Sequence, residues 1–166
     1  MAFNIRLISS ALLGGFLLAA LSAQPTFAQS AYMPVSKYDP KRDADRDIRD
    51  AVAEAKRTKR RVLLEVGGDW CSWCHHMDDF FGAHADLTTL RDKNFITVKI
   101  NFSEDNQNKE VLARYAPIPG YPHLFVLDSE GKLVRSQDTS ALEEGKSYNL
   151  ERFTTFLAYW AWAKEN

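Results

Sequence analysis

The sequence predicts an α/β domain with a central mixed β-sheet flanked by helices. Helix-type and strand-type segments alternate along most of the chain, and the last two strand-like runs are joined by a tight turn. The composition, 45% hydrophobic and 26% charged over 166 residues, suits a single globular domain. Helices and strands alternate in the first part of the chain, and two strands form a hairpin near its end. This order implies parallel and antiparallel strands in one sheet, with helices on both faces.

Residues 1–28 have the pattern of a secretory signal peptide. Arg6 is the only charge, residues 7–21 are apolar apart from two serines and two glycines, and small residues precede a cleavage site after Ala28. The apolar run is shorter than the roughly 20 residues of a spanning helix, although a retained anchor stays open as an alternative. We expect a periplasmic or otherwise extracytoplasmic protein.

The remainder divides into a polar linker, residues 29–42, and a domain, residues 43–166. The net charge of −1 gives no reason to expect a nucleic-acid partner. Residues 56–61 hold five basic side chains, which we interpret as the C-terminus of a helix, where cations complement the helix dipole.

The elements of the domain follow from apolar spacing and from turn residues. In the first part, these signals predict a helix around residues 48–55, a strand at 61–66, helices at 71–81 and 86–92, and a strand at 95–101. In the second part, they predict a short helix at 109–115, a strand at 124–127, a turn at 128–131, a strand at 132–134 and a helix at 150–164.

Cys71 and Cys74 are the only cysteines, and two residues separate them. A bridge between them closes a very small loop and adds little rigidity, so its purpose is chemical. The pair directly follows a predicted strand and opens a predicted helix, whose positive end stabilises a thiolate on Cys71. Cys74, one turn later, can resolve a mixed disulfide formed by Cys71.

This arrangement resembles the thioredoxin superfamily, in particular exported thioredoxin-like proteins with the motif Asp-Trp-Cys-x-x-Cys. The resemblance covers about residues 45–164. It rests on Asp-Trp-Cys-Ser-Trp-Cys at 69–74, Gly-Tyr-Pro at 120–122 and the strand–turn–strand segment at 124–134. It implies a thioredoxin fold.

The resemblance also implies roles for residues outside the dithiol. Pro122 is the expected cis-proline against the dithiol, and the Tyr121 backbone would pair with an extended substrate. Glu65, six residues before Cys71, is the expected buried carboxylate that moves a proton to or from Cys74, with Lys99 nearby. The alternatives are a trans loop proline at Pro122, an outward-facing Glu65 and a solvent-exposed Lys99.

Several positions depart from the best-known thioredoxin pattern. Ser72 and Trp73 replace Gly-Pro between the cysteines, and His123 stands where a threonine commonly follows the proline. These changes leave the redox potential open. Trp70 and Trp73 are candidate substrate-contacting residues, although Trp73 could instead pack against its own loop.

Other interpretations of the motif stay open at this stage. Cys-Ser-Trp-Cys-His at residues 71–75 also matches the attachment motif for c-type haem. Cys71, Cys74, His75 and His76 could form a zinc site, although structural zinc sites usually join two separated segments. A third alternative is a binding module that keeps the fold without exchanging disulfides.

The sequence is therefore interpreted as a protein-disulfide oxidoreductase, most simply a reductase. The expected partners are thiol or disulfide-containing proteins and a membrane electron donor or acceptor. No cofactor is implied, because the two sulfurs hold both electrons. We expect a monomer.

Overall fold

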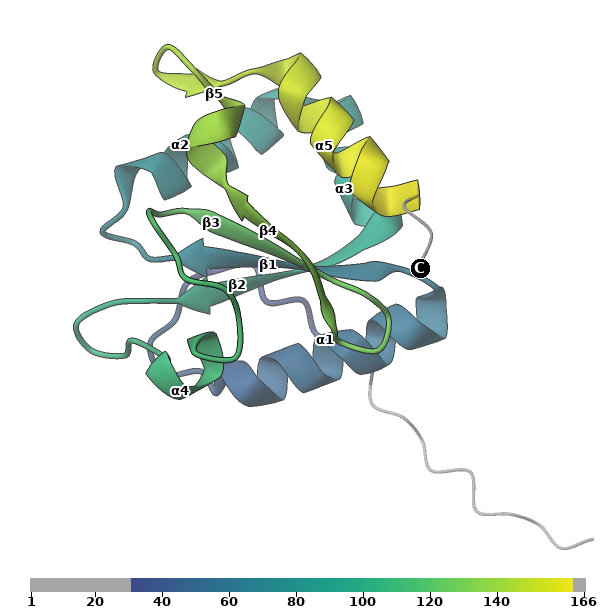
Figure 1. Ribbon diagram of the computed structural model, residues 1–166, viewed down its shortest axis with the longest axis vertical. Coiled ribbons are helices and arrows are strands. Elements are labelled where there is room, and N and C mark those ends of the chain that lie inside the picture. Colours follow the sequence, from purple (N-terminus) through teal and green to yellow (C-terminus); the bar gives the residue numbers. More distant parts are fainter. Residues whose placement is uncertain (1–30, 163–166) are drawn as a thin grey trace, which may run out of the picture. The chain divides into compact units, whose positions relative to one another are not determined.

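The structure is a computed structural model that describes residues 31–162, and these residues contain a four-stranded sheet covered by helices (Figure 1). The predicted signal peptide, residues 1–28, lies outside the described part. The strands of the sheet are β1 (Arg61–Gly67), β2 (Phe95–Asn101), β3 (His123–Leu127) and β4 (Leu133–Asp138).

The sheet is mixed, as the sequence predicts. Its order is β2-β1-β3-β4. β1 runs parallel to β2 and antiparallel to β3, and β3 pairs with β4 in an antiparallel hairpin. Gly131, at φ 84°, provides the left-handed conformation that the turn between β3 and β4 requires. The two central strands, β1 and β3, are buried along their whole length, which explains their continuous apolar runs.

Helices lie on both faces of the sheet (Figure 1). They are α1 (Ala44–Thr58), α2 (Ser72–Ala83), α3 (Ala85–Asn94), α4 (Lys109–Leu112) and α5 (Leu150–Trp162). α1 and α4 cover one face, whereas α2, α3 and α5 cover the other. α1 begins at an N-cap, Asp43, whose carboxylate accepts from the Arg46 amide.

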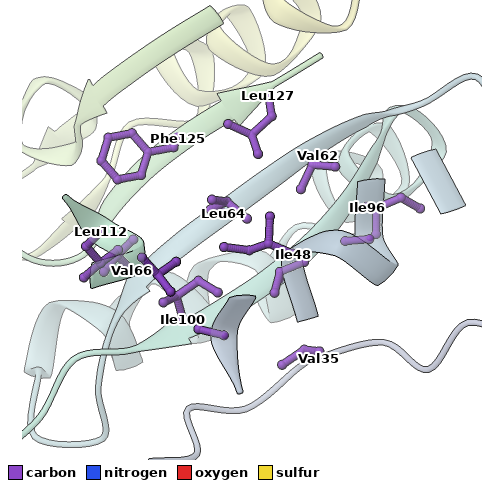
Figure 2. Close-up of a cluster of buried hydrophobic side chains, with 14 of the residues drawn as sticks. Val35, Ile48, Val62, Leu64, Val66, Ile96, Ile100, Leu112, Phe125 and Leu127 are labelled. Carbon is purple, nitrogen blue, oxygen red and sulfur yellow. The ribbon is translucent and has the colours of Figure 1, made fainter. Parts of the chain in front are cut away.

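The apolar side chains of β1 alternate between the two faces of the sheet. Figure 2 shows Val62, Leu64 and Val66 in the cluster that also contains Ile48 of α1. Leu63 belongs to the other cluster, beneath α2, α3 and α5. Because side chains alternate along a strand, Glu65 projects to the same face as Leu63, the face that α2 covers.

The structure adds elements between β4 and α5 that the sequence did not predict. They are a 3-10 helix η1 (Thr139–Leu142) and a small hairpin of β5 (Glu143–Glu144) and β6 (Ser147–Tyr148). Strands of two residues are too short to show an alternating pattern, so periodicity could not reveal them. β4 is also longer than expected, whereas α4 ends at Leu112, earlier than expected.

The described part of the expected linker, residues 31–42, packs against the domain. Val35 forms a parallel bridge with Val98 on the outer edge of β2, and the Lys99 amide donates to the Val35 carbonyl oxygen. Tyr38 is buried, with 6% of its surface exposed. This segment therefore supplies side chains to the core. No helix among residues 31–162 is both long and apolar enough to cross a membrane.

His123 is buried at the start of β3 and makes the stability of the fold depend on pH. Its Nε2 lies 2.8 Å from Ser136 Oγ, its ring packs on Phe125, and Asp138 lies opposite it on β4. Burial lowers the pKa of His123, and the charge of Asp138 opposes this only in part. The unfolded chain, with an ordinary histidine pKa near 6.5, then binds the proton more readily than the folded one.

We predict that the free energy of unfolding is highest above about pH 6.5 and falls as the pH drops toward the lowered pKa of His123. Urea unfolding at about pH 7.5 and about pH 5 measures this loss. His123→Thr reduces the difference between the two values, and the surface substitution His76→Thr leaves it unchanged. An equal loss in wild type and His123→Thr would contradict the prediction.

Candidate active site

The two cysteines lie at the N-terminus of α2, on the face of the sheet to which Glu65 projects. Cys71 is the N-cap residue of α2, and the Cys74 amide donates to Cys71 Sγ over 3.2 Å. The two residues form a disulfide, with Cα atoms 5.2 Å apart. Only 4% of Cys71 is exposed, and Cys74 is completely buried. When the bond is reduced, the helix dipole and the Cys74 amide stabilise negative charge on Cys71.

Gly67, the last residue of β1, allows Cys74 to approach the sheet. A Cβ at this position would lie 3.0 Å from Tyr38 Oη and closer still to Cys74 Sγ. The hydrogen of Gly67 therefore occupies a space bordered by the Tyr38 hydroxyl and the Cys74 sulfur. Any larger side chain would push α2 or Tyr38 away from the end of β1.

Glu65 is buried in a group of polar side chains beneath α2. Only 2% of it is exposed. Its Oε1 accepts a hydrogen bond from the Tyr38 hydroxyl over 2.6 Å and lies 3.3 Å from Lys99 Nζ. Lys99 Nζ also donates to Asp78 Oδ1 over 2.6 Å, and the Asp78 side chain is half exposed. The group thus runs from the buried Tyr38 hydroxyl to the half-exposed carboxylate of Asp78.

Local geometry explains how the chain brings these side chains together. Glu65 and Lys99 are paired in the parallel register of β1 and β2, so both project to the face that α2 covers. Asp78 follows Cys74 by four residues, which places both on one side of α2. The expected juxtaposition of Glu65 and Lys99 is present in the structure.

Sequence analysis missed two members of this group. Asp78 could have been found, because its spacing from Cys74 places it one helical turn along the same face. Tyr38 gave no comparable signal. It lies 27 residues before Glu65, in a polar stretch that showed neither helical nor strand periodicity.

A loop after α4 brings aromatic side chains to the dithiol. The Tyr121–Pro122 peptide bond is cis, and the Pro122 carbonyl oxygen accepts a hydrogen bond from Thr139 Oγ1 over 2.6 Å. Tyr121 packs against the cluster that contains both cysteines. Its ring meets the edge of Trp70, which is 58% exposed. Trp70 and Tyr121 therefore form an apolar surface beside Cys71.

Trp73 is more enclosed than Trp70. Its ring makes edge contacts with Tyr148 of β6 and with His76, and the Tyr148 hydroxyl donates to the Trp73 carbonyl oxygen over 3.2 Å. Of the two expectations for Trp73, these contacts favour packing over free exposure. The half-buried ring also joins α2 to the β5–β6 hairpin.

The histidines after the motif do not converge on the cysteines. His75 Nε2 lies 2.8 Å from the Asp69 carbonyl oxygen, and His76 packs against Trp73. Within residues 31–162, no three side chains of the metal-binding types are grouped closely enough to hold an ion. The chemistry that the arrangement directly provides is that of a dithiol beside a buried carboxylate.

Comparisons with known proteins agree with this geometry. A thioredoxin-like family model matches residues 43–129. The chain is 27% identical over 92 residues to the disulfide bond reductase DsbH of Chlamydia pneumoniae, covering 50% of this chain and 55% of that protein. It is 30% identical over 135 residues to the thiol:disulfide interchange protein DsbD of Pseudomonas sp. (strain JR1 / K1), covering 77% of this chain and 22% of that protein.

A solved structure is also similar. It is the crystal structure of a disulphide isomerase from Xylella fastidiosa Temecula1, with a TM-score of 0.62 and 29% identity. The match covers 73% of this chain and 93% of that one. By contrast, the chain spans only about half the length of the curated reductase and about a fifth of the interchange protein.

Lys99 is the counter-ion that makes the burial of Glu65 tolerable. We predict that Lys99→Met lowers the free energy of unfolding by about 3 kcal/mol, because it leaves a buried carboxylate without its cation. Adding Glu65→Gln should restore most of this loss, since the glutamine oxygen can still accept from Tyr38. Urea denaturation of the two single variants and the double variant measures the coupling.

The exposed lysine of α3 provides the control for this cycle. Lys93→Met removes an equal charge from the surface and should change the free energy of unfolding by no more than about 0.5 kcal/mol. The contradicting result is a double variant whose loss of unfolding free energy equals the sum of the losses in Lys99→Met and Glu65→Gln. Such additivity would show that the two side chains do not stabilise each other.

Proposed function

The chain belongs to the thioredoxin-like family, and from this we propose that it is an extracytoplasmic thiol–disulfide oxidoreductase that reduces protein disulfides. One observation carries the proposal. Cys71 caps α2, while Cys74 borders Gly67 together with the Tyr38 hydroxyl, which donates to the buried carboxylate of Glu65. A purely structural disulfide needs neither a thiolate-stabilising helix end nor an adjacent proton acceptor.

The proposed reaction proceeds in two exchanges. The Cys71 thiolate attacks one sulfur of a substrate disulfide, and the other substrate sulfur leaves as a thiolate that takes a proton from solvent. Cys74 then loses its proton and attacks Cys71 Sγ. The Cys71–Cys74 bond forms, the bond between Cys71 and the substrate breaks, and the second substrate thiol is released. The substrate gains the two electrons that the enzyme dithiol loses.

The other expected residues have roles in this reaction. Glu65 accepts the proton of Cys74, and Lys99 holds that carboxylate in place beneath α2. Tyr121 and Pro122, with the exposed ring of Trp70, form the surface against which the substrate chain lies next to Cys71. Trp73, whose half-buried ring packs against the cluster of the two cysteines, is a further candidate for contact with the substrate.

The compartment and the direction of exchange are parts of the same proposal. The signal-like residues 1–28 support export, and the similarity to a protein named as a disulfide bond reductase supports reduction. A reductase in an oxidising compartment must be reduced again after each turnover, which requires a dithiol donor supplied from the membrane. We propose that the chain acts on its substrates as a monomer.

Removal of the resolving cysteine tests the two-step reaction. We predict that Cys74→Ser accumulates a covalent mixed disulfide between Cys71 and a substrate such as insulin, because nothing displaces the substrate from Cys71. Mass spectrometry of the non-reduced adduct locates the linked cysteine. Cys71→Ser, the matched control, should form little adduct because Cys74 has no exposed surface and does not cap the helix. Equal adduct yields from the two variants would contradict the assigned roles.

The state of the protein in cells tests compartment and direction together. We predict that a bacterial host producing the full chain holds it in the extracytoplasmic fraction, with the mass of residues 29–166 and both cysteines open to alkylation at lysis. Residues 1–28 retained on the chain would indicate an anchor. A Cys71–Cys74 disulfide that persists when a membrane donor is present would make the protein an oxidant and contradict the proposed direction.

A further inference from the structure

Tyr38 contacts both the buried carboxylate of Glu65 and the cluster that contains the two cysteines. Its ring is buried in a small cluster with Cys71 and Cys74, and its hydroxyl donates to Glu65 Oε1 over 2.6 Å. A Cβ added at Gly67 would meet both the Tyr38 oxygen and Cys74 Sγ, so both atoms border the same point at the end of β1. The Tyr38 hydroxyl is thus bonded to Glu65, and its residue packs in the same cluster as Cys74.

The hydrogen-bonding capacity of a tyrosine hydroxyl fits this position. A phenol has one hydrogen to donate and lone pairs with which to accept. The hydrogen of Tyr38 is committed to Glu65, so the lone pairs are left for a donor on the side of Cys74. In the reduced protein, Cys74 of the same cluster carries an S–H group that can supply this donor.

We propose that Tyr38 relays the proton of Cys74 to Glu65 during the resolving step. This inference rests on the proposed exchange reaction and adds a residue to it. As Cys74 attacks Cys71 Sγ, its thiol proton passes to Tyr38 Oη while the hydrogen of Tyr38 passes to the Glu65 carboxylate. Tyr38 ends the step as a neutral phenol, Glu65 is protonated, and the bond from Cys71 to the substrate breaks as described above.

The charged groups around Tyr38 suit a relay. Lys99 Nζ lies 4.5 Å from the centre of its ring and also contacts Glu65 and Asp78, and Tyr148 of β6 lies near enough to interact electrostatically. Burial and the neighbouring Glu65 raise the pKa of Tyr38 well above its ordinary value. The hydroxyl therefore stays protonated between turnovers and passes a proton on without becoming a lasting base.

A groove gives the proton an exit to solvent. Glu65, Asp78 and Lys99 line a cavity of about 860 Å³ between α2, α3 and the edge of β2. Asp78 is half exposed at this cavity and is bound to Lys99. Glu65 can thus lose the proton toward this groove after each turnover.

The reaction of the reduced protein with the chromogenic disulfide DTNB separates the two steps. Attack by Cys71 releases the first coloured thiolate, and resolution by Cys74 releases the second. We expect Tyr38→Phe, which keeps the ring, to leave the first phase unchanged and to slow the second about tenfold or more near pH 7. The second phase of this variant should quicken as the pH rises toward the ordinary thiol pKa of about 8.5, because Cys74 must then ionise into solvent.

Two further variants of the chain show whether the slower second phase is caused by loss of the proton relay. Tyr32→Phe removes another buried hydroxyl from the same N-terminal segment, one without a hydrogen-bond partner among the described residues, and should leave both phases unchanged. Tyr38→Phe combined with Glu65→Gln should be no slower in the second phase than the slower single variant, because both changes interrupt one path.

Three results would overturn the inference: an unchanged second phase in Tyr38→Phe, an equal slowing of both phases, or additive slowing in the double variant. Failure of the proposed function is a separate outcome. In that case wild type does not speed the reduction of insulin by dithiothreitol, whatever the two DTNB phases show.

Discussion

The pairing of Glu65 with Lys99 across the parallel strands β1 and β2 is the interaction on which the site depends. A carboxylate this deep in a domain is costly unless a cation and hydrogen bonds compensate it. The strand register supplies the cation, and Tyr38 supplies the hydrogen bond. The sheet that forms the core therefore also fixes a buried carboxylate on the face that α2 covers.

The dithiol packs close to this group because β1 ends in glycine. Without a side chain at Gly67, the Cys74 sulfur and the Tyr38 hydroxyl approach the same point at the end of the strand. Cys71, at the N-cap, instead lies at the positive end of the helix dipole. The two cysteines thus receive different environments from one strand–helix junction, as an attacking and a resolving thiol require.

The sequence predicted the features that depend on local patterns. Cys71 and Cys74 follow a continuous apolar strand and begin a helix, and each of these signals spans only a few residues. The roles of Glu65 and Lys99 came from the resemblance to a family. Tyr38 could not be predicted, because its contact with Glu65 joins residues 27 positions apart and no periodicity marks its segment. Likewise, strands of two residues such as β5 and β6 carry no alternating pattern.

Catalytic turnover is the most direct test of the central claim that this dithiol exchanges disulfides with proteins. The rate of insulin reduction by dithiothreitol can be followed with and without the purified chain. The account predicts that wild type accelerates the reaction and that Cys71→Ser does not. Reduction that is no faster with wild type than with dithiothreitol alone would contradict it and would favour a binding module that keeps the fold.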